Sequence, residues 1–171
     1  MIKNISNLGD AALYCDFGIE VNKKINSEVI KYFKAIKEKN IIGINNLTPS
    51  YNKLIISYDL QLTNFKEIKQ KIETLNINEA EKINSKILEI PVCCDASFSL
   101  DIERLEKKIN LSRDKIFENF FNTEYFCYMT GFIAGMPFLG NLDENMRVQR
   151  LETPRVKAVS YTHLRAHETR H

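Results

Sequence analysis

The sequence predicts an α+β fold, and the order and period of its apolar segments lead to that prediction. Along the first half, the segments follow the order strand, helix, strand, strand, helix. The helical segments repeat apolar residues at spacings of three and four, whereas the strand segments are short and rich in β-branched residues. Two helices over one face of a mostly antiparallel sheet form an α+β layer arrangement. The order is that of the split βαβ motif in a ferredoxin-like α/β sandwich.

The N-terminal domain is expected to span residues 1–80, and its first elements are a strand and a helix. Residues 11–17 alternate loosely in polarity and predict a strand that closes at Gly18. Ser27 is the expected N-cap of the helix, since Glu28 then lies in the first turn, where the helix dipole favours an acid. Apolar residues at helical spacing follow from Val29.

The rest of this domain is expected to complete the sheet and add a second helix. Residues 41–47 and 54–58 predict strands, and Asn64 is the expected cap of a helix over residues 65–75. A further strand is expected near Val21 or around Ile87.

The second domain is expected to span residues 86–158. A strand over residues 87–92 is followed by two short helices, over 101–109 and 112–121, with Ser112 as the cap of the second. Another strand, over residues 125–133, leads into a loop rich in Gly and Pro. Phe132 and Phe138 are expected in the core of this domain.

Composition indicates an ordinary soluble protein. The chain of 171 residues is 44% hydrophobic and 27% charged, with a formal net charge of +2. Such a balance argues against nucleic acid as a partner, because a basic face is expected there. No segment approaches the roughly 20 apolar residues of a membrane span, and the N-terminus lacks the apolar run of a signal peptide. We therefore expect a cytoplasmic protein with no membrane partner.

Side chains suited to proton transfer or metal binding are scarce. The sequence contains no P-loop, no Gly-x-Gly-x-x-Gly and no Ser-His-Asp set, and its His residues are His163, His167 and His171. No Cys-x-x-Cys pair is present, so no metal site is expected. The Cys residues are interpreted as small buried hydrophobes, with a reactive Cys93 or Cys94 as the alternative.

The stretch from residue 125 to 155 is the best candidate for a functional site. Gly131, Gly135 and Pro137 permit or fix backbone angles that other residues disfavour. Asp143 follows, and then come Arg147, Arg150 and Arg155. The planar guanidinium group of arginine binds carboxylate or phosphate through two parallel hydrogen bonds, so this loop could hold an anionic substrate. Surface ion pairing with neighbouring acids is the alternative.

The same stretch resembles a known family. Gly-Phe-Ile-x-Gly-x-Pro-Phe-Leu-Gly-x-Leu-Asp, from Gly131 to Asp143, and Thr-Pro-Arg, from Thr153 to Arg155, are similar to the signature of the B subunit of 5-oxoprolinase. That family includes a sporulation-kinase inhibitor and the carboxyltransferase part (subdomains C and D) of urea amidolyase, also called allophanate hydrolase subunit 1. Matches further upstream occur in the family's order: Gly9-Asp10, Phe17-Gly18, Pro49-x-Tyr51-x-x-Leu54, Tyr58-Asp59 and Ile90-Pro91-Val92.

The resemblance implies the B subunit of an ATP-dependent 5-oxoprolinase, an enzyme that hydrolyses a lactam with partner subunits A and C. It also implies that the second domain is the first part of a cyclophilin-like β-barrel. Gly131, Gly135, Pro137, Asp143, Arg150 and Arg155 are the residues expected to contact substrate or nucleotide. The catalytic residues stay unassigned, and ATP is the expected cofactor, at a site that could be shared with the partner subunits.

Two alternatives remain within the same family. Phe120 stands where a His is usual, and Phe cannot transfer protons. This favours a non-catalytic inhibitor that binds a sporulation histidine kinase. The other alternative is the carboxyltransferase part of a urea amidolyase-type enzyme, which needs biotin.

Residues 159–171 differ in composition from everything before them. Residues 159–169 match the translation of a sequencing-library adapter, so this tail is expected to be non-native and the family's C-terminal part to be truncated. A genuine basic terminus is the alternative, in which His163 and His167 would share one helix face.

Overall fold

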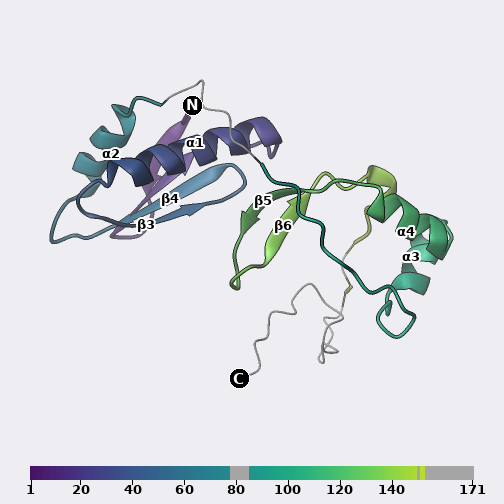
Figure 1. Cartoon of the computed structure of the whole chain (residues 1–171). Helices are drawn as coiled ribbons and strands as arrows, with labels where there is room; N and C mark the ends of the chain where they lie inside the picture. The colour runs from purple at the N-terminus through teal and green to yellow at the C-terminus, as the bar shows by residue number, and fades with distance from the viewer. Residues whose placement is uncertain (78–84, 150, 153–171) are drawn as a thin grey trace. The chain divides into compact units, whose positions relative to one another are not determined.

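The computed structural model describes residues 1–77, 85–149 and 151–152, and the chain divides into two compact units. The first unit is Met1–Lys86 and the second is Ile87–His171. Each unit combines helices with an antiparallel sheet (Figure 1). The tail expected to be non-native lies outside the described residues.

The first unit is built on a four-stranded sheet. Its strands are β1 (Asn4–Asn7), β2 (Ala12–Asp16), β3 (Ile44–Pro49) and β4 (Lys53–Tyr58), arranged in the order β1-β2-β4-β3. All neighbours are antiparallel. Since β4 lies between β2 and β3, those two strands run parallel to each other. Helix α1 (Lys23–Lys39) connects them, so β2-α1-β3 is a βαβ unit split by β4.

The core lies on one face of this sheet because burial alternates along the strands. In β2, Leu13 and Cys15 are buried while their neighbours are half-buried, and β4 shows the same period of two. Helix α1 and helix α2 (Phe65–Glu73) both contribute to the same buried cluster. Both helices therefore cover the same face, as predicted. The cluster comprises Ile5, Leu13, Cys15, Phe17, Val29, Ile36, Leu54, Ile56, Tyr58, Ile68 and Ile72.

The start of α1 differs from the prediction. The N-cap is Asn22, whose side-chain oxygen accepts a hydrogen bond from the Ile25 amide at 2.9 Å. Ser27 lies inside the helix, so its predicted capping role is wrong. The first turn of α1 carries no acidic residue. The prediction relied on Glu28 in the first turn, and it therefore placed the start of the helix too late in the sequence. The other two predicted caps are confirmed. Asn64 accepts from the Glu67 amide at 3.1 Å and begins α2, and Ser112 accepts from the Lys115 amide at 3.4 Å at the start of the helix that follows it.

The fourth strand of the sheet lies elsewhere than predicted. It is β1, which precedes the first predicted strand and pairs with β2. The described residues around Val21 form no strand, and residues 87–92 are irregular. A strand needs a partner for its backbone groups, and no strand among the described residues pairs with 87–92. The strand expected at 41–47 begins at Ile44 and runs to Pro49.

The second unit contains two helices and a hairpin. The helices are α3 (Ile102–Ile109) and α4 (Arg113–Phe121). Strands β5 (Phe126–Thr130) and β6 (Pro137–Gly140) pair antiparallel, and a 3-10 helix, Glu144–Met146, follows. Both helices match the prediction. The loop of the predicted site is thus partly a strand, because β6 lies within it.

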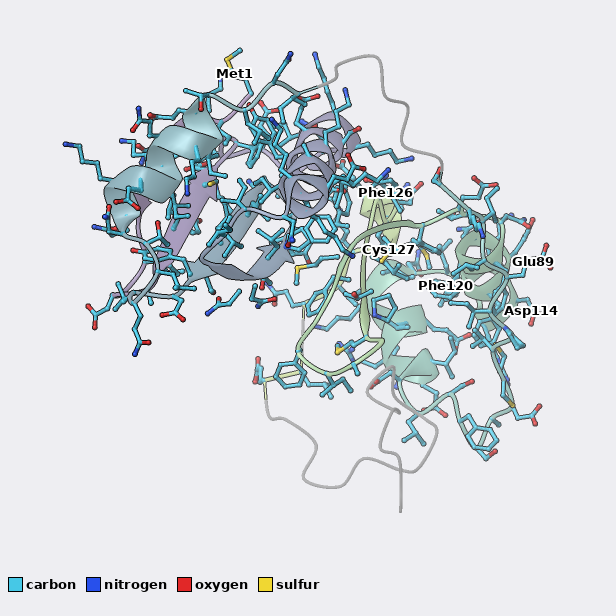
Figure 2. All side chains as sticks on the ribbon, turned by 60° about the vertical axis from the view of Figure 1, so that its left-hand side comes forward. Met1, Glu89, Asp114, Phe120, Phe126 and Cys127 are labelled. Atoms are coloured by element: carbon cyan, nitrogen blue, oxygen red, sulfur yellow. The ribbon has the colours of Figure 1, made fainter. Side chains whose placement is uncertain are left out.

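Burial differs sharply between the two units. Among the described residues, the second unit buries the hydrophobic side chains Ile116 and Tyr128, whereas the first unit buries the whole cluster above. Large hydrophobic residues exposed in the second unit include Phe120 on α4, labelled in Figure 2. No helix in the described ranges is long and apolar enough to cross a membrane.

Candidate functional site

The β5–β6 hairpin places three of the predicted site residues on one short structure. Gly131 follows β5 directly, Gly135 lies in the connecting loop with φ +78°, and Pro137 begins β6. The loop is closed by its own backbone: the Gly131 amide donates to the Met136 carbonyl at 3.1 Å, and the Met136 amide donates to the Ile133 carbonyl at 3.2 Å. Figure 2 labels Phe126 and Cys127, where β5 begins.

Tyr128 fixes the base of the hairpin. Its side chain is 4% exposed, and its ring lies so close to Gly140 that a Cβ there would collide with it. The Tyr128 hydroxyl donates to the Asn141 side-chain oxygen at 3.1 Å. Its ring also meets the Phe126 ring edge-on, with centroids 4.7 Å apart. Gly140 is therefore a packing requirement of this base.

Phe132 lies at the surface, so the prediction that it belongs to the core is wrong. Its side chain is 76% exposed, and its backbone adopts φ +68°. A bulky residue rarely occupies this left-handed region, and the conformation costs about 1–3 kcal/mol. The short loop between paired strands imposes it. Sequence reasoning missed Phe132 as a surface residue because an aromatic between apolar neighbours is usually interpreted as core.

Asp143 caps a short helix beside the hairpin. Its carboxylate accepts from the Asn145 amide at 2.8 Å. Arg147 pairs with Glu144 at 3.6 Å, and both side chains are mainly exposed. Arg150 and Arg155 lie outside the described residues. The described part thus brings together Gly131, Gly135 and Pro137, while an arginine cluster around Asp143 stays a prediction.

Phe120, which the sequence resemblance placed at the position of a usual His, lies in an aromatic cluster. Phe120 on α4 has its ring centroid 5.1 Å from that of Tyr125 and 5.5 Å from that of Phe121. Burial raises the pKa of Tyr125 above its usual value. These three aromatic side chains pack against one another and form no acid–base pair among themselves.

The cysteines fall into two environments. Cys15 lies in the core of the first unit, and burial raises the pKa of its thiol to about 12, so it behaves as a small hydrophobe, as predicted. Cys93 and Cys127 are exposed, so the prediction that the cysteines are buried is wrong for these two. Whether Cys93 or Cys94 reacts stays a prediction.

A polar cluster in the first unit was not predicted. The buried Asn52 donates to the carbonyls of Gly18 and Glu20 at 2.8 and 3.0 Å. Lys53 pairs with Asp16 and donates to the Gly18 carbonyl at 2.7 Å. These bonds tie the turn after β2 to the turn before β4.

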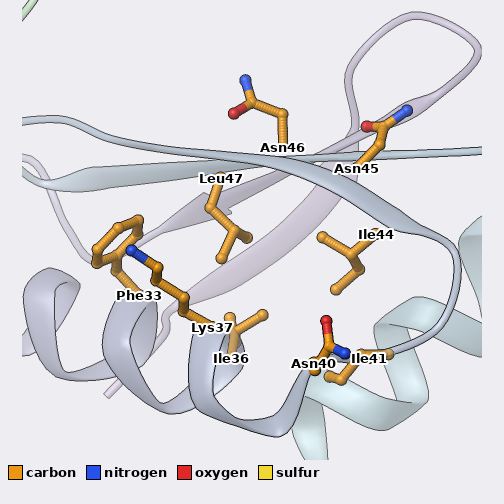
Figure 3. A pocket seen from close by; sticks show the side chains of 9 residues that line it. All are labelled: Phe33, Ile36, Lys37, Asn40, Ile41, Ile44, Asn45, Asn46 and Leu47. Carbon is orange, nitrogen blue, oxygen red and sulfur yellow. The ribbon is translucent and has the colours of Figure 1, made fainter.

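The first unit also has a shallow groove of about 300 Å³ between α1 and β3. Figure 3 shows Ile44 and Leu47 pointing from β3 toward the helix, while Asn45 and Asn46 point away. Two successive outward residues reflect the register shift of β3 at this point. Lys37 lies over the Phe33 ring at 5.8 Å. The described residues that line the groove include no cluster of ionisable partners suited to catalysis.

Comparison with known proteins decides the family. The model of the family described as carboxyltransferase domain, subdomain C and D, matches residues 3–160. The chain belongs to this carboxyltransferase family.

Two curated proteins have sequences similar to this chain. The B subunit of 5-oxoprolinase from Bacillus subtilis (strain 168) is 31% identical over 163 residues, which cover 88% of this chain and 68% of the relative. The corresponding 5-oxoprolinase subunit of Haemophilus influenzae is 24% identical over 158 residues, covering 89% of this chain and 70% of the relative.

Solved structures share the fold. TTHA0988 superposes with a TM-score of 0.74 at 23% identity, over 87% of this chain and 29% of its own. The urea carboxylase of Kluyveromyces lactis gives a TM-score of 0.59 at 13% identity, over 74% of this chain and 13% of its own. This chain therefore spans less than a third of either longer polypeptide, and the likeness at these identities concerns the fold.

Proposed function

We propose that this chain is the B subunit of an ATP-dependent 5-oxoprolinase. The observation that carries the proposal is the 31% identity to the Bacillus subtilis subunit over 88% of the chain. The reaction converts 5-oxoproline, ATP and water to glutamate, ADP and phosphate. A five-membered lactam is a stable amide, so transfer of a phosphoryl group to its oxygen makes the carbonyl carbon electrophilic before water attacks.

The chain is proposed to supply part of a site that partner subunits A and C complete. The sequence has no P-loop and, before residue 163, no His, so it lacks the usual phosphate cradle and general base. Binding of the substrate carboxylate or a nucleotide phosphate is assigned to the segment after the hairpin. Gly131, Gly135 and Pro137 shape the backbone of the hairpin that precedes it, and Asp143, Arg150 and Arg155 supply the charges.

The same proposal includes a specific fold for each of the two domains. The split β2-α1-β3 unit supports a ferredoxin-like first domain over 1–80, in which β1 takes the outer place beside β2. The second domain, over 86–158, is proposed to be the first part of a cyclophilin-like barrel, and residues 159–171 a non-native tail. Cytoplasmic localisation follows from the proposed reaction, since ATP is its co-substrate.

The proposed anion site is tested with a matched pair of arginine variants. Arg155→Ala is expected to raise the KM for 5-oxoproline or ATP at least tenfold in the reconstituted complex, because a bidentate charged contact is lost. Arg147→Ala is the control, since Arg147 pairs with Glu144 on the surface, and it should change KM less than twofold. Equal effects of the two variants would contradict the assignment of Arg155.

One observation favours a second function. Phe120 replaces the usual His and packs against the aromatic rings of Phe121 and Tyr125. A family member that had lost catalysis could inhibit a sporulation histidine kinase by binding it. Suppressed kinase autophosphorylation, together with no 5-oxoproline-dependent ATP hydrolysis in the presence of subunits A and C, would replace the first proposal by this one.

A further inference from the structure

Strand β3 lies at one edge of the four-stranded sheet, and part of its backbone faces away from β4. Just beyond the end of β3, the Ser50 amide donates to the Lys53 carbonyl at 2.8 Å. Residues of an antiparallel pair alternate between positions that bond to the partner strand and positions that do not. Thr48 therefore directs its backbone groups at β4, and Leu47 directs its own outward. Leu47 thus offers an N–H and a C=O at the edge of the sheet.

The side chain of Leu47 lines the groove between α1 and β3. Figure 3 shows Leu47 and Ile44 pointing from the strand toward the helix, where Phe33 and Ile36 also line the groove. Residues directly opposite each other in two antiparallel strands have their side chains on the same face. An extended segment that paired with the edge at Leu47 would place its own side chain over this apolar floor. Peptides that bind by strand addition use main-chain bonds for affinity and pockets for alternate side chains for specificity.

Lys37 gives the groove a positive charge. Its Nζ lies 5.8 Å from the centroid of the Phe33 ring, and its side chain reaches along the groove in Figure 3. The other described residues that line the groove carry no charge. A carboxylate on a bound segment would therefore meet this lysine without a competing acid in the lining.

A second copy of this chain fits the edge poorly. The register of β3 shifts between Ile44 and Asn46, and the strand ends at Pro49, which has no N–H. A bulge and a proline are features that keep edge strands from pairing with one another, and they leave a short stretch around Leu47 for pairing. The strand, Ile-Asn-Asn-Leu-Thr-Pro, also has no acidic residue that could meet Lys37.

We propose that the edge of β3 binds an extended peptide segment of another protein, antiparallel to the strand. The segment carries an apolar side chain opposite Leu47. Two residues away, on the same face, it carries an acidic side chain that pairs with Lys37. This docking surface does not depend on the proposed function, since it uses neither the β5–β6 hairpin nor the arginines assigned to the anion site.

The test uses the full chain, isotope-labelled for NMR, and the synthetic peptide acetyl-Thr-Val-Thr-Val-Thr-Glu-Ser-amide. In an extended peptide the two Val and the Glu share one face. The backbone amides of β3, including that of Leu47, are expected to shift in a saturable way at millimolar peptide or below. Those of β1, at the other edge of the sheet, are expected to stay unchanged.

Lysine variants test the charge of the groove. Lys37→Glu is expected to weaken binding at least fivefold, because it places a like charge beside the acid of the peptide. Lys37→Gln, which removes the charge alone, should act in the same direction with a smaller effect. Lys24→Glu is the matched control, because Lys24 is exposed near the start of the same helix and does not line the groove. It should change the affinity less than twofold.

A modified peptide tests the main-chain pairing. Methylation of the nitrogen of the second Val removes the donor that faces the Leu47 carbonyl, and it should weaken binding at least tenfold. Equal affinity of the methylated peptide would overturn strand addition, and equal effects of Lys37→Glu and Lys24→Glu would overturn the role of Lys37. Absence of shifts in β3 at millimolar peptide would overturn the whole proposal. So would sedimentation that shows a dimer whose formation the peptide does not disturb and whose interface covers β3.

Discussion

The space around a residue in the first unit limits the size of its side chain, and Gly43 is the clearest case. Its φ is +94°, and a Cβ there would lie 2.5 Å from Cγ2 of Thr63. Thr63 cannot easily move, because it is 7% exposed and its hydroxyl donates to Glu67 at 3.0 Å. Gly43 thus permits the approach of the start of β3 to the start of α2.

Gly43→Ala is therefore expected to lower the free energy of unfolding by about 1–3 kcal/mol, as overpacking does. Gly9→Ala serves as the control, because Gly9 also has positive φ, +62°, but nothing lies within 4 Å of its added Cβ. Urea unfolding followed by circular dichroism measures both. If the two variants lost the same stability, the contact with Thr63 would not matter.

The ion pair of Asp16 and Lys53 gives the first unit an acid-sensitive contact. The hydrogen bond from Lys53, with a second from the Gly18 amide, lowers the pKa of the Asp16 carboxyl below its usual value. A carboxyl whose pKa is lowered on folding adds stability above its unfolded pKa and loses it as pH falls through the folded one.

Stability should accordingly fall as the pH drops below about 4, the usual range of an Asp carboxyl. Asp16→Asn should be less stable than the unsubstituted chain at pH 7 and lose less stability on acidification. Urea midpoints between pH 7 and pH 3 measure this. Parallel pH curves for the two proteins would show that the ion pair does not contribute.

At the scale of elements, the structure and the sequence pattern differ in where α1 begins. Asn22→Ala removes the side chain that accepts from the Ile25 amide, and it should cost about 1 kcal/mol of stability. Ser27→Ala should cost nothing or stabilise slightly, because Ala is the best helix former in a helix interior. The opposite order of the two variants in a urea titration would restore Ser27 as the cap.

The elements that sequence reasoning found are those with a strong local signal. Helix α2 has a good cap at Asn64 and apolar residues at helical spacing, and β4 is apolar with β-branched residues. Strand β1 has no such signal: its sequence is Asn-Ile-Ser-Asn, and it is a strand because β2 offers a partner. Residues 87–92 are apolar but form no strand, since pairing is a tertiary property.

The candidate site, too, could be predicted from the sequence only in part. A loop rich in Gly and Pro could be recognised from the sequence, because these residues have distinct backbone requirements. That Pro137–Gly140 pairs with β5, and that Phe132 is consequently pushed out of the core, depends on strand register. Sequence alone does not determine such a register where one face is not clearly apolar.

At the scale of the molecule, the buried apolar residues in the described ranges are concentrated in the first unit. Leu13, Cys15, Leu54 and Ile56 on the two central strands are 0% exposed. Opening these strands requires exposure of the core, whereas the described part of the second unit buries Ile116 and Tyr128 as its hydrophobic residues. Stability should therefore differ between the units.

Hydrogen exchange measured by mass spectrometry tests this difference. Amides of β2 and β4 are expected to exchange slowest, and those of β5 and β6 at least tenfold faster in the chain without partners. Equal protection of the two sheets in the isolated chain would contradict the uneven distribution of stability.

The central claim is that this member of the carboxyltransferase family is a working part of a 5-oxoprolinase. The most direct measurement is phosphate release from ATP by this chain mixed with subunits A and C, with and without 5-oxoproline. The account predicts hydrolysis that requires 5-oxoproline, yields glutamate and disappears when this chain is omitted. Hydrolysis that does not depend on 5-oxoproline, or that continues unchanged without this chain, would contradict it.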